Sequence, residues 1–491
     1  MATGFAYEYP RMSTYARRRC SLRQFALGND FADPQLLDIY KAEMAYGIER
    51  FFLLSYCLAC CWPPAFGAKN SLRIVKQWST LEFGFPSPEA KQLALEKRYY
   101  VPGASVPIDV DVQHRGGGQK SRIFVTNPRF DEGRPVTLGT VGDDTLIYGY
   151  PDYSWHDNQG QNCDGMTSVF RVAIDTCSRL WVMDAGKIGE KQVCPPQLLA
   201  FDLNTDQLVY RHKVDPLNYI ATSLFITPVL DVRGNDPNDC SDTFVYVADV
   251  SGYGLLVVDV ANDRSWRVTH RYFYPYPNHG TFTIDGESFD LMDGVLGLAM
   301  SPYERGQDRF LYFHALASTT ENVVRTSVIR NDSFISNSNA NPYSINVFPE
   351  ERPNQSAAEA MDKDGVLYFG LMEPPGIWCW NSATEFSTRN FHQIAINRET
   401  LQFSSGMKIV NNLKGEQELW ALTSSFQRVM TGSISDDRIN FRIHAEKIPK
   451  LLGNSACSMP PRDNSIGDHA HRISGPDIPK YSFKYGAVSY L

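Results

Sequence analysis

The sequence predicts an all-β protein, a six-bladed β-propeller whose ring is closed by a strand from near the N-terminus. Three observations predict this fold. A short apolar phrase with an aromatic residue in second place recurs six times, runs of β-branched and aromatic residues bounded by turn residues surround it, and another strand candidate precedes the first phrase. No long amphipathic helical pattern separates the repeats, so a helical repeat protein is excluded.

The repeated phrases define the blades. They are IFVTN at 123–127, LWVMD at 180–184, VYVAD at 245–249, LYFHA at 311–315, LYFGL at 367–371 and LWALT at 419–423. Successive aromatic positions are 52 to 66 residues apart, and self-similarity at a regular spacing of about this length indicates a repeat architecture. Six phrases predict six blades. Two separate β-sandwiches are the alternative, which the even spacing does not favour.

Further strands are expected on both sides of the phrases. Apolar runs at 168–175, 223–232 and 294–301 precede a phrase, and runs at 198–203 and 255–260 follow one. Three to four strands in each unit are typical of a propeller blade. The stretch 71–83 comes before the first blade, and we expect it to complete the sixth blade around Trp420, so that no sheet edge stays unpaired.

The first 67 residues do not follow the repeat. Within residues 44–67, Arg50 precedes an apolar run that ends in small residues, which is the pattern of a secretory signal peptide. The run is too short to span a membrane, and a buried helix is the alternative. We predict four divisions of the chain. Residues 1–43 are a mis-assigned start or dispensable leader, and residues 44–67 are the signal peptide. Residues 68–452 form the propeller, and residues 453–491 are a C-terminal tail packed on the ring.

Composition indicates a globular, exported protein. The chain is 43% hydrophobic and 21% charged, which is ordinary for a folded domain. Its net charge of −8 leaves no basic field to neutralise phosphates, so nucleic acid is excluded as the main partner. Glycosylation sequons begin at Asn331 and Asn354. We therefore expect a secreted, extracellular protein without a membrane span.

Six cysteines remain after the predicted signal. An even number in an exported protein predicts three disulfides, with several connectivities open. We expect Cys379 to pair with Cys457, which would fasten the tail across the ring closure, and the other four to pair among themselves around the second and third blades. The six are Cys163, Cys177, Cys194, Cys240, Cys379 and Cys457.

Several stretches resemble one known family. They are TNPRFDEGRPVTLG, TSVFRVAIDTCSRLWVMDAG, VCPPQLLAFDL, FVYVADVSGYGLLVVDV, SWRVTHRYF and DGVLGLAMSP. From about residue 78 to about residue 420, the order of these stretches and their sequences resemble the yellow/major royal jelly protein family of insects. That resemblance implies a secreted six-bladed propeller, in agreement with the repeat count.

The resemblance implies several functions rather than one. Family members include dopachrome-converting enzymes of the melanin pathway, binders of biogenic amines, food or storage proteins, and proteins of cuticle or eggshell. The sequences SLFITPVLDV and GESFDLMDGVLGLAMSP are most similar to the eggshell-associated branch of the family. We therefore expect a role in cuticle or eggshell maturation, in the setting of quinone and melanin chemistry. The alternatives are a dopachrome-converting tautomerase and a binder of small aromatic amines. Expected partners are a small aromatic amine or quinone and extracellular matrix proteins.

Candidate catalytic residues are acids near strand ends. The chain lacks the common nucleophile, metalloprotease and phosphate-loop motifs, and no cofactor is predicted. A tautomerase needs a general base, and Asp184, Asp249 and Glu373 follow repeated phrases where they could reach the mouth of the central channel. The alternative is that such acids bind turn amides.

No metal site is predicted. His469 and His471 form the only close histidine pair, and it falls in the tail. Asp109 and Asp111 alternate along a predicted strand, where we expect their side chains to be solvated on one face.

The resemblance to amine-binding relatives implies a further set of residues. There the ligand is held by a threonine, an amide and aromatic faces. The matching strand here, NVVRTSVIR, places Thr326 in the first role, with Asn341 and Tyr343 downstream as the amide and the aromatic residue.

Overall fold

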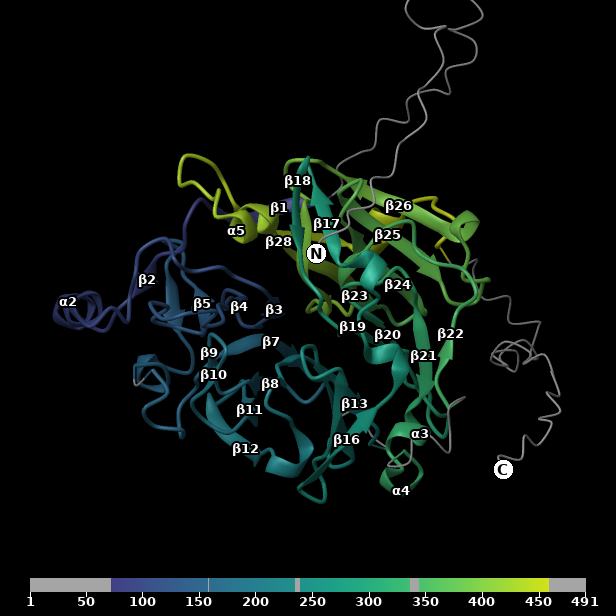
Figure 1. The fold of residues 1–491 in the computed structure, drawn as a ribbon, viewed down its shortest axis with the longest axis horizontal. Coiled ribbons are helices and arrows are strands. Elements are labelled where there is room, and N and C mark those ends of the chain that lie inside the picture. Colours follow the sequence, from purple (N-terminus) through teal and green to yellow (C-terminus); the bar gives the residue numbers. More distant parts are fainter. Residues whose placement is uncertain (1–71, 158, 235–238, 336–343, 459–491) are drawn as a thin grey trace, which may run out of the picture. The chain divides into compact units, whose positions relative to one another are not determined.

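The computed structural model describes residues 72–157, 159–234, 239–335 and 344–458. Their strands form six mainly antiparallel sheets that follow one another around an axis in chain order (Figure 1). The predicted six-bladed propeller is confirmed. The predicted leader, the signal peptide and most of the tail lie outside the described residues.

Each blade has four strands, named here in order from the axis outward; blade 1 carries a short fifth strand, β2 (Phe83–Gly84), parallel to β6. Blade 1 is β3 (Val110–Gln113), β4 (Arg122–Thr126), β5 (Leu138–Val141) and β6 (Ile147–Gly149). Blade 2 is β7 (Val169–Ile174), β8 (Arg179–Asp184), β11 (Gln197–Asp202) and β12 (Gln207–Lys213). Blade 3 is β13 (Phe225–Val232), β14 (Thr243–Asp249), β15 (Gly254–Asp259) and β16 (Arg264–Thr269).

Blades 4 to 6 repeat the pattern. Blade 4 is β19 (Val295–Met300), β20 (Phe310–Ala315), β21 (Asn322–Arg325) and β22 (Asn346–Val347). Blade 5 is β23 (Ser356–Met361), β24 (Val366–Leu371), β25 (Gly376–Asn381) and β26 (Phe391–Ile396). Blade 6 is β27 (Phe403–Asn411), β28 (Gln417–Ser424), β29 (Phe441–Lys447) and β1 (Arg73–Trp78). We call the face at which the innermost strands begin the top face.

The remaining elements are short and lie between or outside the blade strands. They are the hairpins β9 (Lys187–Ile188)–β10 (Lys191–Gln192) and β17 (Thr281–Ile284)–β18 (Glu287–Asp290), the helices α2 (Pro88–Glu96), α3 (Thr326–Ile329), α4 (Asp332–Ile335), α5 (Phe426–Thr431) and α6 (Ile448–Leu452), and single 3₁₀ turns at 153–155, 216–218, 271–273, 277–279 and 388–390. None of the described helices is long and apolar enough to cross a membrane.

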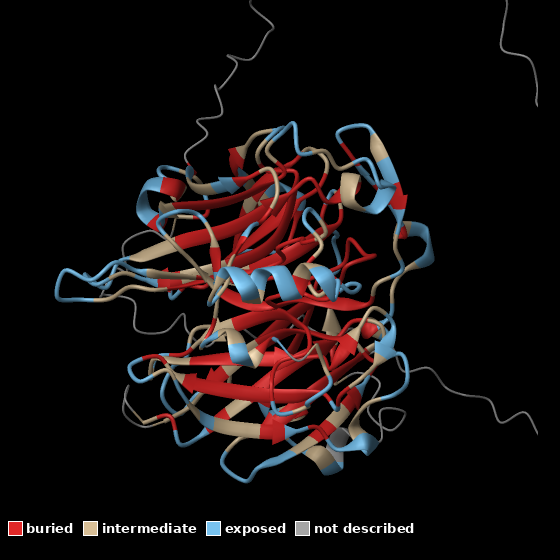
Figure 2. Ribbon diagram, turned by 90° about the vertical axis from the view of Figure 1, so that its left-hand side faces the viewer, coloured by how far each residue is buried: buried red, intermediate tan, exposed pale blue. Residues whose placement is uncertain are grey.

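The repeated phrase is the second strand of every blade, and packing explains its aromatic residue. Trp181 of β8 packs against β14 and β15 of blade 3, and Tyr368 of β24 packs against β27 and β28 of blade 6. Large aromatic side chains bury more apolar area than any other residue, so one at each interface joins neighbouring blades. Buried residues accordingly follow the strands (Figure 2).

A recurring aspartate binds the polar tip of this aromatic residue in three blades. Asp175 accepts a hydrogen bond from Trp181 Nε1 at 2.8 Å, and equivalent bonds join Tyr246 to Asp231 and Tyr368 to Asp362. Buried Trp and Tyr groups need such partners. The repeat is thus a packing unit with its own hydrogen bond.

Strand β1 closes the ring as predicted. It pairs antiparallel with β29, with Trp78 opposite Phe441, and becomes the outermost strand of blade 6. Ring closure is reinforced near the axis, where the ammonium of Lys408 on β27 lies 2.7 Å from Oδ2 of Asp109 beside β3. The first and last parts of the described chain are therefore joined both by strand pairing and by an ion pair.

The prediction that Asp109 and Asp111 are solvated is wrong. Both are buried, and their Oδ2 atoms accept hydrogen bonds from the backbone amides of Val172 and Ile174 on β7. Burial, followed by the charge of Asp109, raises the pKa of Asp111 to about 7 although Lys408 lowers it. The pair joins blade 1 to blade 2.

Three disulfides connect the six cysteines of the propeller region. Cys163 bonds to Cys194, Cys177 to Cys240, and Cys379 to Cys457. The last pair ties α6 and the start of the tail to β25 of blade 5, and it agrees with the pairing expected from the sequence.

Candidate functional site

A cavity of about 340 Å³ lies on the top face. Its volume is at the lower end of the range for small-molecule sites. It is lined by residues from three connections: the β17–β18 hairpin, the link from β26 to β27, and the segment between β28 and β29. The lining residues are Asp285, Arg398, Glu399, Gln402, Ser425, Arg428, Arg438 and Ile439.

The β17–β18 hairpin is anchored by aromatic stacking. The rings of Phe282 and Phe289 stack with centroids 5.2 Å apart, and Phe289 contacts Phe426 of α5, which stacks on Phe403 at 4.5 Å. These residues belong to the largest apolar cluster of the ring. The hairpin is therefore fixed to blade 6 rather than free in solvent.

Ion pairs at the cavity hold the same hairpin. Glu287 accepts a hydrogen bond from Arg428 Nε at 2.9 Å and one from Ser433 at 2.9 Å. The pKa of Glu287 is lowered, first by the hydrogen bond from Arg428. Arg428 thus lines the cavity while its charge is partly compensated.

Arg398 joins two carboxylates at the rim. Its Nη2 lies 3.0 Å from Oε1 of Glu373, and its Nε lies 3.9 Å from Oδ1 of Asp285. Glu373, a candidate from the sequence, therefore lies beside the cavity and is bonded to a lining residue. Acids and guanidinium groups around one small cavity provide both proton acceptors and stabilisers of negative charge.

Gln402 of the cavity lining is hydrogen-bonded to a second buried amide, Gln427. Gln427 Nε2 donates to Gln402 Oε1 at 3.1 Å, and Gln402 Nε2 donates to Asp285 Oδ2 at 3.4 Å. Gln427 is fully buried, and its Oε1 has no protein partner among the described residues. The chain of amides ends at Asp285, the carboxylate on the hairpin tip.

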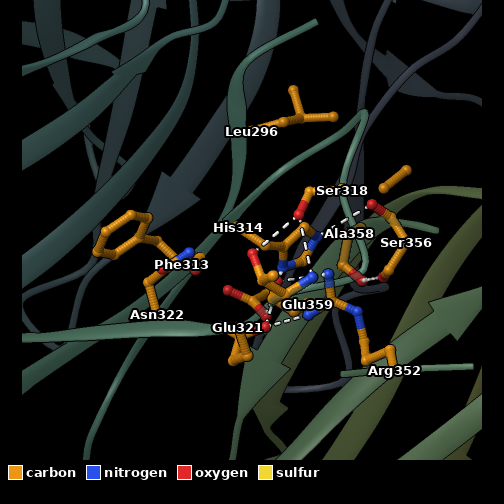
Figure 3. Close-up of polar contacts among 12 residues, drawn as sticks. Leu296, Phe313, His314, Ser318, Glu321, Asn322, Arg352, Ser356, Ala358 and Glu359 are labelled. Atoms are coloured by element: carbon orange, nitrogen blue, oxygen red, sulfur yellow. Dashed lines mark hydrogen bonds and ion pairs between the residues drawn. The ribbon is translucent and has the colours of Figure 1, made fainter. Parts of the chain in front are cut away.

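A second polar cluster lies between blades 4 and 5, under the surface. His314 Nδ1 is 3.2 Å from Oε2 of Glu321 and 3.1 Å from Oε2 of Glu359, and Arg352 forms an ion pair with Glu321. Figure 3 shows His314 and Arg352 converging on the two glutamates. The Nε2 atom of His314 lies 3.0 Å from the carbonyl oxygen of Ser356.

This cluster has the donor set of a metal site, but its contacts favour a proton. His314, Glu321 and Glu359 offer ligand atoms within 4.8 Å of one another. Nε2 of His314 faces a carbonyl oxygen, so it must carry a proton and donate it. Nδ1 faces two carboxylates, so it also needs a positive group between them, either a proton or a metal ion. Arg352 already neutralises Glu321, and one proton on the imidazole completes the charge balance.

The pKa directions agree with a held proton. Burial and Arg352 lower the pKa of His314, but the two glutamates raise it more, and the result lies above the ordinary value. Burial, then the charge of Glu321, raises the pKa of Glu359. The cluster is inaccessible, and we assign it to the packing of blades 4 and 5.

Arg171 of β7 fills the axis of the ring. Its guanidinium donates to Thr227 Oγ1 at 2.7 Å and to the Ser405 carbonyl at 2.6 Å, with longer contacts to the carbonyls of Leu296 and Ala357. These acceptors belong to blades 3, 6, 4 and 5. The innermost strands of blades 2 to 6 are therefore joined by one side chain at the axis.

Asp184 and Asp249, proposed from the sequence as bases, are fully buried. Asp184 accepts hydrogen bonds from three backbone amides, those of Thr167, Ser168 and Gly186. Asp249 accepts hydrogen bonds from the backbone amides of Leu224 and Gly252, the hydroxyl of Ser223 and the guanidinium of Arg267. The geometry favours the alternative that both close turns. Of the three acids, Glu373 is the one beside the cavity.

The structure places Thr326 away from the top face. The prediction that NVVRTSVIR forms one strand is wrong beyond Arg325, because β21 ends there and α3 begins at Thr326. Thr326 is buried, and its hydroxyl donates to Asp308 at 3.0 Å. Asn341 and Tyr343 lie outside the described residues, as do His469 and His471.

Sequence reasoning missed several residues that carried a signal. Asp285-Gly286 lies inside TFTIDGESFD, and this dipeptide between alternating apolar residues is typical of a hairpin. His314 occupies the fourth place of its phrase, where the other phrases have an uncharged residue. Asp293, just before β19, has a pKa raised to about 6, first by burial and then by Glu190. Arg398 and Arg428 carried no local signal.

The chain is similar in sequence to proteins of one known family. The family described as major royal jelly protein matches residues 167–457. Major royal jelly protein 9 of Apis mellifera is 33% identical over 80% of this chain and 91% of its own length. Dopaminechrome tautomerase of Drosophila melanogaster is 29% identical over 81% of this chain and 86% of its own. Protein yellow of Drosophila melanogaster is 31% identical over 84% of this chain and 76% of its own. The chain belongs to the yellow/major royal jelly protein family.

Proposed function

We propose that this protein isomerises an aminochrome of the melanin pathway, either dopachrome or dopaminechrome, in the cavity on the top face. One observation carries the proposal: carboxylates and guanidinium groups surround a single small cavity, with Glu373 and Asp285 on either side of Arg398. The relative named dopaminechrome tautomerase gives the reaction class. The isomerisation moves two protons from ring carbons to the two quinone oxygens, so it needs no external oxidant or reductant.

The side chains have complementary roles in this reaction. A carboxylate beside the ring takes a proton from carbon, which leaves negative charge on a quinone oxygen. Arg398 and Arg428 line the cavity and provide the positive groups that stabilise this charge. The carboxylic acid that forms returns a proton to the oxygen or to solvent. Repetition at the neighbouring carbon completes the dihydroxyindole.

The proposal includes an extracellular setting. Six cysteines joined in three disulfides suit an oxidising compartment, and the signal pattern at 44–67 suits export. We propose cuticle or eggshell as the tissue context, because dihydroxyindoles and quinones feed matrix darkening and cross-linking. Binding of a small aromatic amine through Thr326 has less support, since that hydroxyl already donates to Asp308.

The test follows the visible absorbance of an aminochrome with and without purified protein. We expect wild-type protein to accelerate its loss in proportion to protein concentration. Arg398→Met should lower kcat/KM on the order of 100-fold, as expected for loss of one charge-stabilising group. Arg389→Met is the matched control, because this exposed arginine pairs with Glu385 outside the cavity. Equal activity of the two variants would contradict the proposed site.

A further inference from the structure

We propose that Asp285 is the catalytic base of the cavity and that Gln402 positions it. This inference rests on the proposed function and selects one acid for the proton transfer. Among the described residues, the carboxylates that line the cavity or contact a lining residue include Asp285, Glu287, Glu373 and Glu399. Glu287 is bonded to Arg428, which lowers its pKa and makes it a weak base.

Glu373 and Glu399 are also engaged with arginines. Both carboxylate oxygens of Glu373 contact Nη2 of Arg398, at 3.0 and 3.3 Å. Glu399 lies 3.2 Å from Nη2 of Arg442, and 82% of its side chain is exposed to solvent. A carboxylate that accepts hydrogen bonds from a guanidinium has fewer lone pairs open to a substrate in the cavity.

Asp285 keeps more of its accepting capacity. Among the described residues, its shortest polar side-chain contacts are 3.4 Å to Gln402 and 3.9 Å to Arg398. Its side chain is 41% exposed, so a bound ring could remove it from water. A carboxylate whose oxygens are open to the cavity is placed to accept a proton from a ring bound there.

The backbone fixes where this carboxylate lies. Asp285 and Gly286 have φ of +52° and +83°, the left-handed region that the central residues of a tight β-hairpin turn adopt. The stacked rings of Phe282 and Phe289 anchor the strands below the turn. The tip is therefore presented by a rigid element, as a preorganised site requires.

Gln402 acts through Asp285. Its Oε1 accepts a hydrogen bond from the buried Gln427, so its NH₂ group is directed to Asp285 Oδ2. Oδ2 of Asp285 is thus oriented by an amide, and Oδ1, which lies 3.9 Å from Nε of Arg398, is the oxygen that takes the proton. Gln402 is a positioning residue, and its loss should change the pH dependence of the reaction as well as its rate.

The test compares variants in the aminochrome assay. Asp285→Asn keeps the turn, since Asn tolerates positive φ, and removes only the base. We expect kcat to fall 100-fold or more, with KM within about threefold and an unchanged melting temperature. Asp263→Asn is the matched control, because Asp263 also has a positive φ (47°). It lies in the turn between β15 and β16, on the face of the ring opposite the top face.

The remaining variants separate the outcomes. Gln402→Leu should lower kcat less than Asp285→Asn and shift the acidic limb of the kcat/KM pH profile, which a purely structural change would leave in place. If wild-type protein is active and Asp285→Asn retains at least a third of its kcat, this inference is overturned; a large loss in Glu373→Gln would then identify Glu373 as the base. If wild-type protein does not accelerate the reaction, the proposed function fails and this inference fails with it.

Discussion

Replacement of Arg171 by methionine should destabilise the whole ring. Arg171 is 4% exposed, and its guanidinium bridges acceptors in four other blades. Asp109 and Glu359 are the acids whose charges favour its charged form. A methionine side chain in its place would fill part of the volume but would leave two short hydrogen bonds unmade. It would also remove one of the positive charges near Asp109 and Glu359, which would keep their contacts with Lys408 and His314.

The size of the effect follows from these contacts. Hydrogen bonds to a charged group contribute about 1.5–3 kcal/mol each, and removal of one partner of a buried charge cluster costs about 3–5 kcal/mol. We expect a loss of about 3–5 kcal/mol. Unfolding entropy scales at about 2.1 cal/mol/K per residue. For about 390 residues of ring the loss lowers Tm by about 4–6 °C.

The assay is thermal unfolding followed by calorimetry, with urea unfolding as a second measure. Arg171→Lys should fall between wild type and Arg171→Met, because one ammonium retains the charge but cannot span the acceptors. Arg389→Met, an exposed arginine with a single partner, should change Tm by about 1 °C or less. A Tm of Arg171→Met within 1 °C of this control would refute the reasoning.

Two other predictions concern stability. Replacing Cys379 and Cys457 together by serine should cost about 4.5 kcal/mol on chain-entropy grounds, given a sequence separation of 78 residues; a loss below about 1 kcal/mol in urea unfolding would contradict this. The raised pKa values of His314 and Glu359 mean that the folded state binds more protons. Stability should therefore fall as pH rises, from about 4.5 for Glu359 and from about 6.5 for His314, their ordinary pKa values, through their folded pKa values. Glu359→Gln should flatten this part of the stability curve, and an unchanged slope would argue against a proton held there.

The fold was predictable because one physical requirement recurs. Each blade needs a large aromatic side chain, such as Trp181 or Tyr368, to fill the interface with the next, so the same phrase returns at similar spacing. Closure by β1 followed from the need to pair the last sheet edge. The repeated phrase and the need to pair the last sheet edge were therefore enough to predict the blades and the closure of the ring.

The cavity was less predictable because its residues come from connections rather than repeats. Asp285, Arg398 and Arg428 are far apart in the sequence and lie around one cavity only in the folded chain. Glu373, a candidate from the sequence, follows a phrase on the same face and contacts Arg398 of the cavity lining. The sequence could not separate Asp184 from Glu373, since both follow a strand and only the folded contacts distinguish a turn-binding acid from one at the rim.

Product analysis of an aminochrome incubated with the purified protein tests the central claim most directly. An isomerase yields a dihydroxyindole of the same mass as its substrate, in an amount that follows protein concentration and exceeds the spontaneous reaction. We predict this product from dopachrome or dopaminechrome, and its loss in Asp285→Asn. A product mixture and rate identical to those of the protein-free reaction, with folded protein present, would contradict the account.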